Sequence, residues 1–304
     1  MIAYFIRRFF QVIVALLLLL FVMFLMVYVI GDPTRLLLPP EATKVHVEEL
    51  REYLGLNDPV YIQYLRFLNG ALHGDTGQSF YHAENALQLV LERAGATVQL
   101  AGTAILLALA ISIPLGVITA SRRGGWLDRG CLIGSLIGIS VPTFWLGIML
   151  ILIFSIGTGW LPSSGRGGLA HLVLPATTLG LYYVGLFLRL TRAGMLDVLE
   201  QDFVRTARSK GLSEWVVLYK HGLRNALIPF LTITAVQIGE VIAFSIVTET
   251  VFAWPGMGRL LLKSLEKLDY PVLISYVLVI GVMFAIINML VDWLYTILDP
   301  RIRY

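Results

Sequence analysis

The sequence predicts an all-α polytopic membrane protein with six transmembrane helices. Of its 304 residues, 57% are hydrophobic and only 14% are charged, and the mean hydropathy is +0.79. A soluble domain usually carries about 25% charged residues, so this composition indicates a protein of the lipid bilayer. The apolar residues also gather into segments of about 20 residues, which is the length needed to cross roughly 30 Å of hydrocarbon.

Six such segments follow one another along the chain. They cover residues 9–30, 96–120, 131–156, 171–190, 228–250 and 272–298. Arg7 and Arg8 precede the first segment as they would in a signal peptide, but its apolar run is too long and no small-residue cleavage site follows it. We therefore expect the first segment to remain as a transmembrane helix.

Basic residues are concentrated on one side of these segments. They are Arg7, Arg8, Arg122, Arg123, Arg129, Arg189, Arg192, Arg205, Arg208, Lys210, Lys220, Arg224, Arg301 and Arg303. Because loops rich in Lys and Arg resist translocation, both termini are expected to be cytoplasmic. Residues 31–95 then form one large segment on the outer side.

This outer segment is expected to be folded. Val47, Leu50 and Leu54 share a helical face, and Asp58 and Pro59 are suited to be the N-cap and first-turn residue of a second helix that runs through Leu72. The segment is also acidic. It is either a solvated cap over the transmembrane helices or a docking surface for an extracytoplasmic partner.

A polar and strongly basic loop separates the fourth and fifth segments. Apolar positions on one face of its first short helix are Leu196, Leu199, Phe203 and Ala207. Gly211 supplies a helix stop, and Ser213 is placed to cap a second helix. Two short helices around a glycine are typical of a docking element. The alternative is an ordinary amphipathic loop lying on charged lipid headgroups.

The loop resembles the cytoplasmic loop of permease subunits of bacterial ABC importers, the binding-protein-dependent inner-membrane components. That family's general loop reads Glu-Ala-Ala, three residues, then Gly. Arg205, Thr206, Ala207 and Gly211 occupy those positions here, so only the second Ala and the Gly match. The dipeptide, oligopeptide, glutathione and nickel branch is closer, because it carries an RTARAKG variant and a HxLRNALIP segment like residues 221–229.

Further motifs of that branch occur in the same order along nearly the whole chain. They are Gly31-Asp32-Pro33, Leu54-Gly55-Leu56 with Pro59, GDTGQS at 74–79, SVPTFWLG at 140–147, Trp160-Leu161-Pro162 and VFAWPGMG at 251–258. Each motif is weak alone, but together they are specific.

The resemblance implies a type I ABC importer permease. Residues 1–95 would hold the first helix and a large periplasmic segment, and residues 96–304 a five-helix permease core with a coupling loop at about 191–227. The chain would form half of a pathway for short peptides or a similar small solute and would couple to ATPase subunits through residues 197–224. The expected coupling residues are Phe203, Arg205, Thr206, Ala207, Lys210, Gly211, Ser213, Glu214, His221, Arg224 and Asn225.

The resemblance also implies partners and a location. The partners would be a second homologous permease, two cytoplasmic ATPase subunits and a periplasmic or lipid-anchored solute-binding protein, in the bacterial inner membrane and without nucleic acid. ATP and Mg would be used by the ATPase subunits, with no cofactor bound by this chain. Trp254, Pro255 and Gly256 would belong to the periplasmic gate.

Two positions inside the expected helices are candidates for the translocation pathway. Pro142, followed by Thr143, would kink a helix and free backbone carbonyls that must face protein or a water-filled cavity. Glu240 lies near the middle of the fifth segment, where an acid costs about 2.5–3.5 kcal/mol on insertion scales. We therefore expect Glu240 to face the bundle interior, a cavity or a partner subunit.

Motifs for catalysis are missing from the sequence. It has no GxxxxGK[ST] phosphate loop, no HExxH zinc pair and no GxSxG elbow, and its single Cys131 excludes a multi-cysteine metal site. The chain is therefore not expected to be an enzyme, and ATP hydrolysis would occur in separate subunits. The alternative is a stand-alone channel or ion-coupled secondary carrier, which would transport solute without ATPase subunits.

Overall fold

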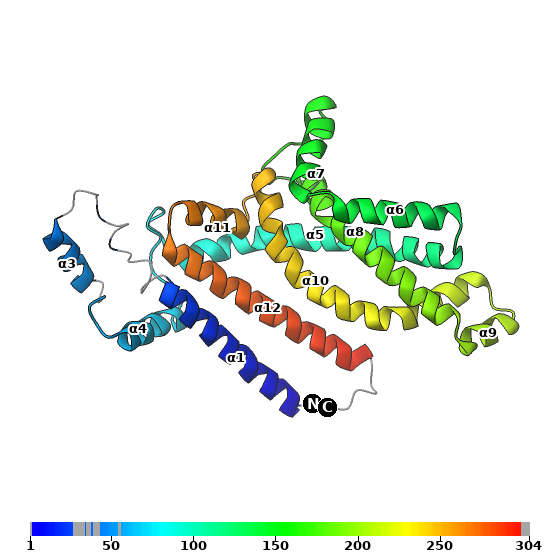
Figure 1. Ribbon diagram of the computed structural model, residues 1–304, viewed down its shortest axis with the longest axis horizontal. Coiled ribbons are helices and arrows are strands. Elements are labelled where there is room, and N and C mark those ends of the chain that lie inside the picture. The colour runs from blue at the N-terminus through cyan, green and yellow to red at the C-terminus, as the bar shows by residue number, and fades with distance from the viewer. Residues whose placement is uncertain (1, 27–33, 35–37, 39–42, 54–55, 299–304) are drawn as a thin grey trace. The chain divides into compact units, whose positions relative to one another are not determined.

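The computed structural model describes residues 2–26, 34, 38, 43–53 and 56–298 (Figure 1). Within these residues the regular structure is helical, apart from one isolated bridge between Gln78 and Asn85. The predicted all-α fold class is confirmed. The end of the first expected span, the motif at 31–33, Leu54, Gly55 and the C-terminal arginines lie outside the described residues.

The chain divides into two compact units, which we describe separately. Unit 1 includes Met1–Gly95 and Leu260–Ile286, and unit 2 includes Ala96–Arg259 and Ile287–Ile302. Three helices cross from one unit to the other along the chain: α5 (Ala86–Ser121), α11 (Met257–Glu266) and α12 (Tyr270–Leu298).

In unit 1, α1 (Ile2–Phe24) runs antiparallel to the first part of α12 (Figure 1). Leu20 of α1 is buried against Ile274. Gly281 lies further along α12 beside two leucines of α1, so its missing side chain lets the helices approach closely.

The outer segment supplies α3 (Lys44–Tyr53) and α4 (Val60–Leu72). Phe67 of α4 stacks on Phe24 of α1 with 5.9 Å between the ring centroids. The expected Asp58 cap is not formed, because Pro59 occupies the cap position and the Asp58 carboxylate pairs with Arg66 of α4.

The GDTGQS segment is fixed to the start of α12 by buried polar groups. Ser79 Oγ donates to Asp269 Oδ2 over 2.6 Å, and Phe80 N donates to Asp269 Oδ1 over 3.2 Å. The hydroxyls of Thr76 and Ser275 lie 2.6 Å apart. Asp269 is only 1% exposed, so these bonds replace the water that its carboxylate has lost.

Unit 2 is built around a buried central helix, α8. Its elements, besides the greater part of α5, are α6 (Trp126–Ser140), α7 (Thr143–Leu150), the π-helical η2 (Ile151–Gly157), α8 (Leu169–Leu199), α9 (Asp202–Ser209), the π-helical η3 (Val216–Leu223) and α10 (Arg224–Val251). Gly180 of α8 approaches the backbone of α5, and Gly185 that of α6. Any larger residue at these two positions would press on a neighbouring carbonyl oxygen.

Five of the described helices are long and apolar enough to span a membrane. They are Ile6–Phe24, Ala86–Ser121, Leu169–Leu199, Pro229–Val251 and Tyr270–Val291. A sixth span requires that the bent pair Trp126–Ser140 and Thr143–Gly157 is counted as one.

The third span expected at 131–156 is thus sharply bent at Pro142, where a kink was expected. The two helices of the pair meet at an angle of 102°. Pro142 has no N–H for a helical bond and disfavours helical geometry at the preceding residue, and Val141 accordingly adopts φ −76° and ψ 124°.

Candidate functional site

Residues 200–223, which we call the basic loop, connect α8 to α10. As expected, α9 ends before Gly211, which has φ +74°. The next helical residue is Glu214, directly after Ser213, whose carbonyl accepts the N–H of Val217. The two short helices around a glycine are thus present, although the second continues into α10 without a break.

A buried apolar cluster supports the basic loop from beneath. It comprises Val117, Ala120, Met195, Val198, Val204, Ala207, Val217 and Ala226, drawn from α5, α8, α9, η3 and α10. Phe203 was expected on the apolar face of the first short helix but is not part of the buried cluster. A separate helix, α9, begins at Asp202, and its buried residues are Val204 and Ala207. The Phe203 side chain is 38% exposed.

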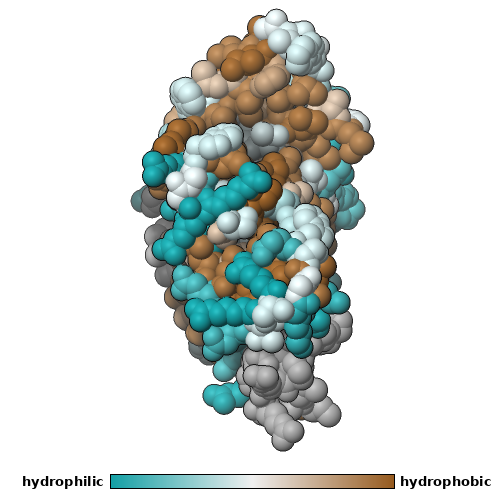
Figure 2. All heavy atoms as spheres, turned by 90° about the vertical axis from the view of Figure 1, so that its right-hand side faces the viewer, coloured by the Kyte–Doolittle hydropathy of each residue, from teal (hydrophilic) through white to brown (hydrophobic). Residues whose placement is uncertain are grey.

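The outer surface of the basic loop mixes large apolar side chains with charge. Trp215 is 68% exposed and Leu212 is 40% exposed, and exposed Arg205, Thr206 and Lys210 lie in the same loop. Figure 2 faces the side on which α9 lies in Figure 1 and shows hydrophilic and hydrophobic side chains interspersed. Apolar groups left on the surface beside cations are typical of a site that docks a protein or contacts a membrane surface.

An exposed ion pair connects the two short helices of the basic loop. The Arg208 Nε atom lies 2.9 Å from Glu214 Oε1, which joins α9 to the start of the second helix across Gly211. Both side chains of this pair are exposed.

A deeper pair fixes α6 to α8 near the loop. Arg192 donates to both carboxylate oxygens of Asp128, over 2.6 and 2.8 Å, and Gly124 N donates to the same group. Asp128 is 2% exposed, so this pair is a structural anchor.

The remaining coupling candidates lie where η3 joins α10. His221 is half-buried, and its carbonyl accepts the side-chain amide of Asn225 over 2.7 Å. Arg224 and Asn225 are exposed. All eleven sequence-predicted coupling residues therefore lie on the basic loop and the first turn of α10.

Phe252–Arg259, which we call the 252–259 loop, comprises the connection that follows α10 and the first residues of α11. Trp254 is fully buried and its indole Nε1 donates to Ala96 O over 2.8 Å. Gly256 is buried and Pro255 is exposed. The Arg259 guanidinium donates back to Ala253 O over 2.9 Å, which closes the loop on itself.

Sequence reasoning missed Glu249, an α10 residue that binds the backbone of this loop. Its side chain is fully buried and accepts hydrogen bonds from Thr97 Oγ1 at 2.6 Å, Ser245 Oγ at 3.1 Å and Arg259 N at 2.9 Å. An acid at the end of an apolar segment looks like an ordinary helix end. Its partner Thr97 is 152 residues away, so only the tertiary fold reveals the contact.

The pathway candidates do not share one pocket. Pro142 lies at the bend between α6 and α7, in an apolar pocket of about 520 Å³ whose other lining residues are Leu136, Ile137, Ser140, Val141, Phe144 and Trp145. Thr143 begins α7 beside this pocket. Glu240 is half-buried in α10 and close enough to Tyr183 of α8 for an electrostatic interaction.

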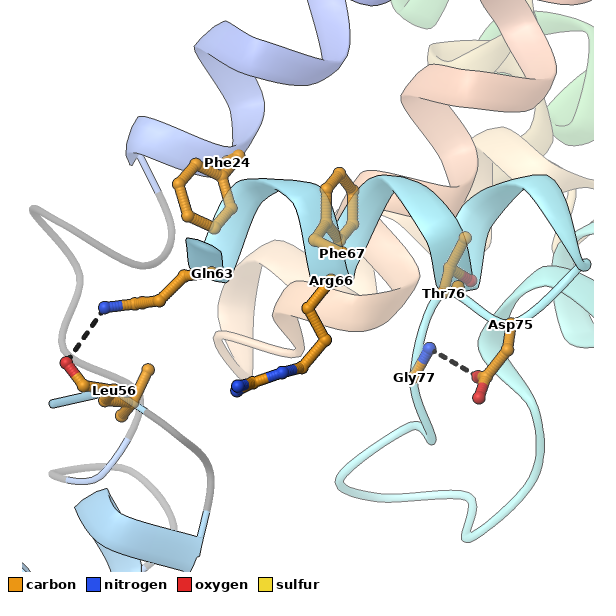
Figure 3. Close-up of a pocket in the computed structure, with 9 residues that line it drawn as sticks. Phe24, Leu56, Gln63, Arg66, Phe67, Asp75, Thr76 and Gly77 are labelled. Atoms are coloured by element: carbon orange, nitrogen blue, oxygen red, sulfur yellow. Dashed lines mark hydrogen bonds between the residues drawn. The ribbon is translucent and has the colours of Figure 1, made fainter. Parts of the chain in front are cut away.

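A second pocket, of about 210 Å³, lies within unit 1 (Figure 3). Phe24 and Phe67 form an aromatic wall, while Arg66, Gln63 and Asp75 contribute polar groups. Gln63 is held by the carbonyls of Leu56 and Asp58, and the Arg66 charge is already paired with Asp58. This pocket therefore offers no uncompensated cation. Among the described residues, no three His, Cys, Asp or Glu side chains gather as metal ligands would.

Comparison with known families matches nearly the whole chain. Residues 112–304 match the family described as binding-protein-dependent transport system inner membrane component, and residues 1–101 match the N-terminal part of such a membrane component.

Individual relatives are similar over nine-tenths or more of their length. The glutathione transport system permease protein GsiC of Pectobacterium atrosepticum is 42% identical over 305 residues, covering 100% of both chains. GsiC of Escherichia coli K12 is 42% identical over 306 residues with the same coverage. A putative peptide transport system permease protein of Brucella abortus is 42% identical over 282 residues, or 90% of each chain.

Solved structures of the MetNI methionine ABC transporter in inward-facing conformations share the fold. One has a TM-score of 0.59 at 17% identity, covering 70% of this chain and 97% of that chain. A second has a TM-score of 0.61 at 16% identity with the same coverage.

Proposed function

The chain belongs to the family of binding-protein-dependent transport system inner membrane components, and it is a multi-pass permease subunit of an ABC importer. From that premise we propose that the basic loop receives an ATPase subunit and that the transported solute is a short peptide such as glutathione. ATP and Mg are then used by separate ATPase subunits, and this chain binds no cofactor.

The surface of the basic loop is the observation that carries this proposal. Trp215, Leu212 and Phe203 stay exposed, although the same loop buries Val204, Ala207 and Val217. A partner that covers the exposed set would remove their apolar area from water, and the neighbouring cations would orient an acidic contact. The cluster beneath the loop packs against α5, α8 and α10, so a displacement of this surface would be transmitted to those helices.

The assembly proposed around the chain has four further members. They are a second, homologous permease, two cytoplasmic ATPase subunits and a periplasmic or lipid-anchored binding protein. The solute follows from the relatives, whose names specify glutathione and peptide transport. Uptake of radiolabelled glutathione and dipeptides into vesicles that contain the whole complex would test it. Uptake of neither solute by an otherwise active complex would contradict the solute assignment.

In the proposed orientation, both termini and the basic loop are cytoplasmic, and residues 31–95 are outside. Glu49 lies on an exposed face of α3. A Glu49→Cys change in a Cys131→Ala background should therefore react with an impermeant thiol reagent in intact spheroplasts. Labelling of this cysteine only after lysis would overturn the orientation.

Two further roles belong to the same proposal. The 252–259 loop, with Trp254, Pro255 and Gly256, closes the outer end of the pathway. Glu240 and the bend at Pro142 and Thr143 border the pathway, since an acid or a freed carbonyl within a membrane span needs a polar neighbour, a partner or water.

Gly211 gives the sharpest test of coupling. Its φ of +74° disfavours any residue with a side chain, while the space around it is open. Gly211→Leu should therefore distort the docking surface, and uptake should fall by at least about tenfold with insertion unchanged. Gly159 also has a positive φ and open space around it, but it lies outside the basic loop. Gly159→Leu is thus the control, and equal uptake by both variants would contradict the coupling role.

A further inference from the structure

Helices α5 and α10 each contact both candidate regions of unit 2. At one end, Val117 of α5 and Ala226 of α10 are buried in the cluster beneath the basic loop. At the other end, Thr97 of α5 and Glu249 of α10 bind the 252–259 loop. The stretches between these contacts are about 30 Å long in α5 and about 35 Å long in α10.

The Glu249 carboxylate joins these two helices to the loop. One of its oxygens accepts the hydroxyl of Thr97, and the other accepts the N–H of Arg259. Thr97 Oγ1 in turn accepts Met257 N over 2.9 Å, so this hydroxyl bridges the carboxylate and the loop backbone. The Glu249 carbonyl accepts Trp254 N over 2.8 Å. Glu249 therefore holds three loop amides. A carboxylate oxygen holds that of Arg259, the Thr97 hydroxyl links the carboxylate to that of Met257, and the main-chain carbonyl holds that of Trp254.

The loop backbone is also shaped around this side chain. A Cβ atom at Gly256 would collide with the Glu249 carboxylate, and one at Gly258 would lie 3.0 Å from its Oε2. Glycine is thus required where the loop passes over the carboxylate. Because Glu249 is 0% exposed, a passing solute would not reach it, and its role is to hold the loop.

We propose that Glu249 is a positioning residue that fixes the 252–259 loop rigidly to the ends of α5 and α10, so that movement of these helices moves the loop. The inference rests on the proposed function, in which the basic loop receives the ATPase movement and the 252–259 loop closes the pathway. It adds a named mechanical joint at the far end of the two helices.

Hydrogen exchange tests the joint without relying on transport. Glu249→Gln keeps the size of the side chain but turns one acceptor oxygen into a donor, which then faces the donor Arg259 N or the hydroxyl of Thr97. In the intact complex, the amides of Met257 and Arg259 should exchange roughly ten- to hundredfold faster, while amides of the basic loop stay unchanged. Unchanged exchange in the 252–259 loop would overturn the proposal.

Coupling is the second readout, and Thr97 supplies a matched pair. Thr97→Val removes the bridging hydroxyl at nearly constant shape, whereas Thr97→Ser retains it. Glu249→Gln and Thr97→Val should each lower solute uptake per ATP hydrolysed by about tenfold while hydrolysis continues. Thr97→Ser should behave as the native chain, as should Glu266→Gln, which changes an exposed carboxylate of α11.

The outcomes separate this inference from the proposed function. If uptake by the native complex proves independent of ATP, the proposed function fails, whatever the exchange data show. If uptake depends on ATP but Glu249→Gln and Thr97→Val leave uptake per ATP unchanged, the positioning role of Glu249 is wrong. Equal losses in Thr97→Val and Thr97→Ser would likewise exclude the bridging hydroxyl.

Discussion

The two loops at opposite ends of α10 contain similar residues but differ in which of them are exposed. Each contains a tryptophan and a residue with positive φ, but Trp215 of the basic loop is 68% exposed and Trp254 of the 252–259 loop is 0% exposed. The basic loop turns its charges toward solvent, whereas the 252–259 loop turns its backbone donors inward onto Glu249. In the proposed function, the exposed apolar groups beside charge form a surface for a partner, whereas the internal pairing fixes the other loop within the chain.

The two tryptophans should show the largest contrast. Trp254→Ala removes a fully buried side chain and its hydrogen bond to Ala96, so we expect a loss of about 3–5 kcal/mol of stability. Trp215→Ala should cost less than about 0.5 kcal/mol, since the ring contacts mainly Tyr219, but should weaken recovery of the ATPase subunits. Thermal unfolding of the purified chain and co-purification measure the two effects. Equal destabilisation by both variants would remove the contrast.

Two acidic side chains that pair with arginine should differ next. Asp128→Asn leaves Arg192 facing a neutral partner in a buried site, and we expect about 3 kcal/mol of destabilisation. Glu214→Gln breaks an exposed pair and should change stability by less than about 1 kcal/mol. Thermal unfolding of both variants at low and high salt would measure this. A larger loss of stability for Glu214→Gln than for Asp128→Asn would show that the exposed pair, too, stabilises the fold of the chain.

Glu240 should have the smallest effect on stability. Glu240→Gln keeps the shape and removes one charge from a half-buried position, so stability should change by less than about 0.5 kcal/mol. If the carboxylate borders the pathway, the preference for cationic over neutral peptides should fall by roughly fivefold. Competition uptake assays with matched peptides measure this preference. An unchanged preference together with unchanged subunit assembly would leave Glu240 without a role.

The sequence predicted the helical elements better than their packing. Gly211 was identifiable as a helix stop because glycine adopts positive φ readily whatever its tertiary neighbours are. Its φ of +74° agrees with this prediction. The kink at Pro142 was predicted, but its angle of 102° was not, since hydropathy measures how apolar a segment is and not its direction. Phe203 was assigned to a buried face because α8 and α9 were treated as one helical period.

Glu249 illustrates what a single sequence withholds. Its partners Thr97 and Arg259 are 152 and 10 residues away, on α5 and in the 252–259 loop. Neither residue carries a local pattern that points to the other. The Gly256 and Gly258 pair within the PGMG motif was the available signal, because two glycines near one turn often mark a close approach of the backbone to another group.

The central claim, that the basic loop receives an ATPase subunit, is tested most directly by photo-crosslinking from two exposed tryptophans. Trp215 lies in the basic loop, and Trp160, which is 75% exposed, lies in the loop between η2 and α8. Replacing each with benzoylphenylalanine in the assembled complex should give an adduct with the ATPase subunit from position 215 and none from position 160. An intact complex that crosslinks to the ATPase from position 160 but not from position 215 would contradict the account.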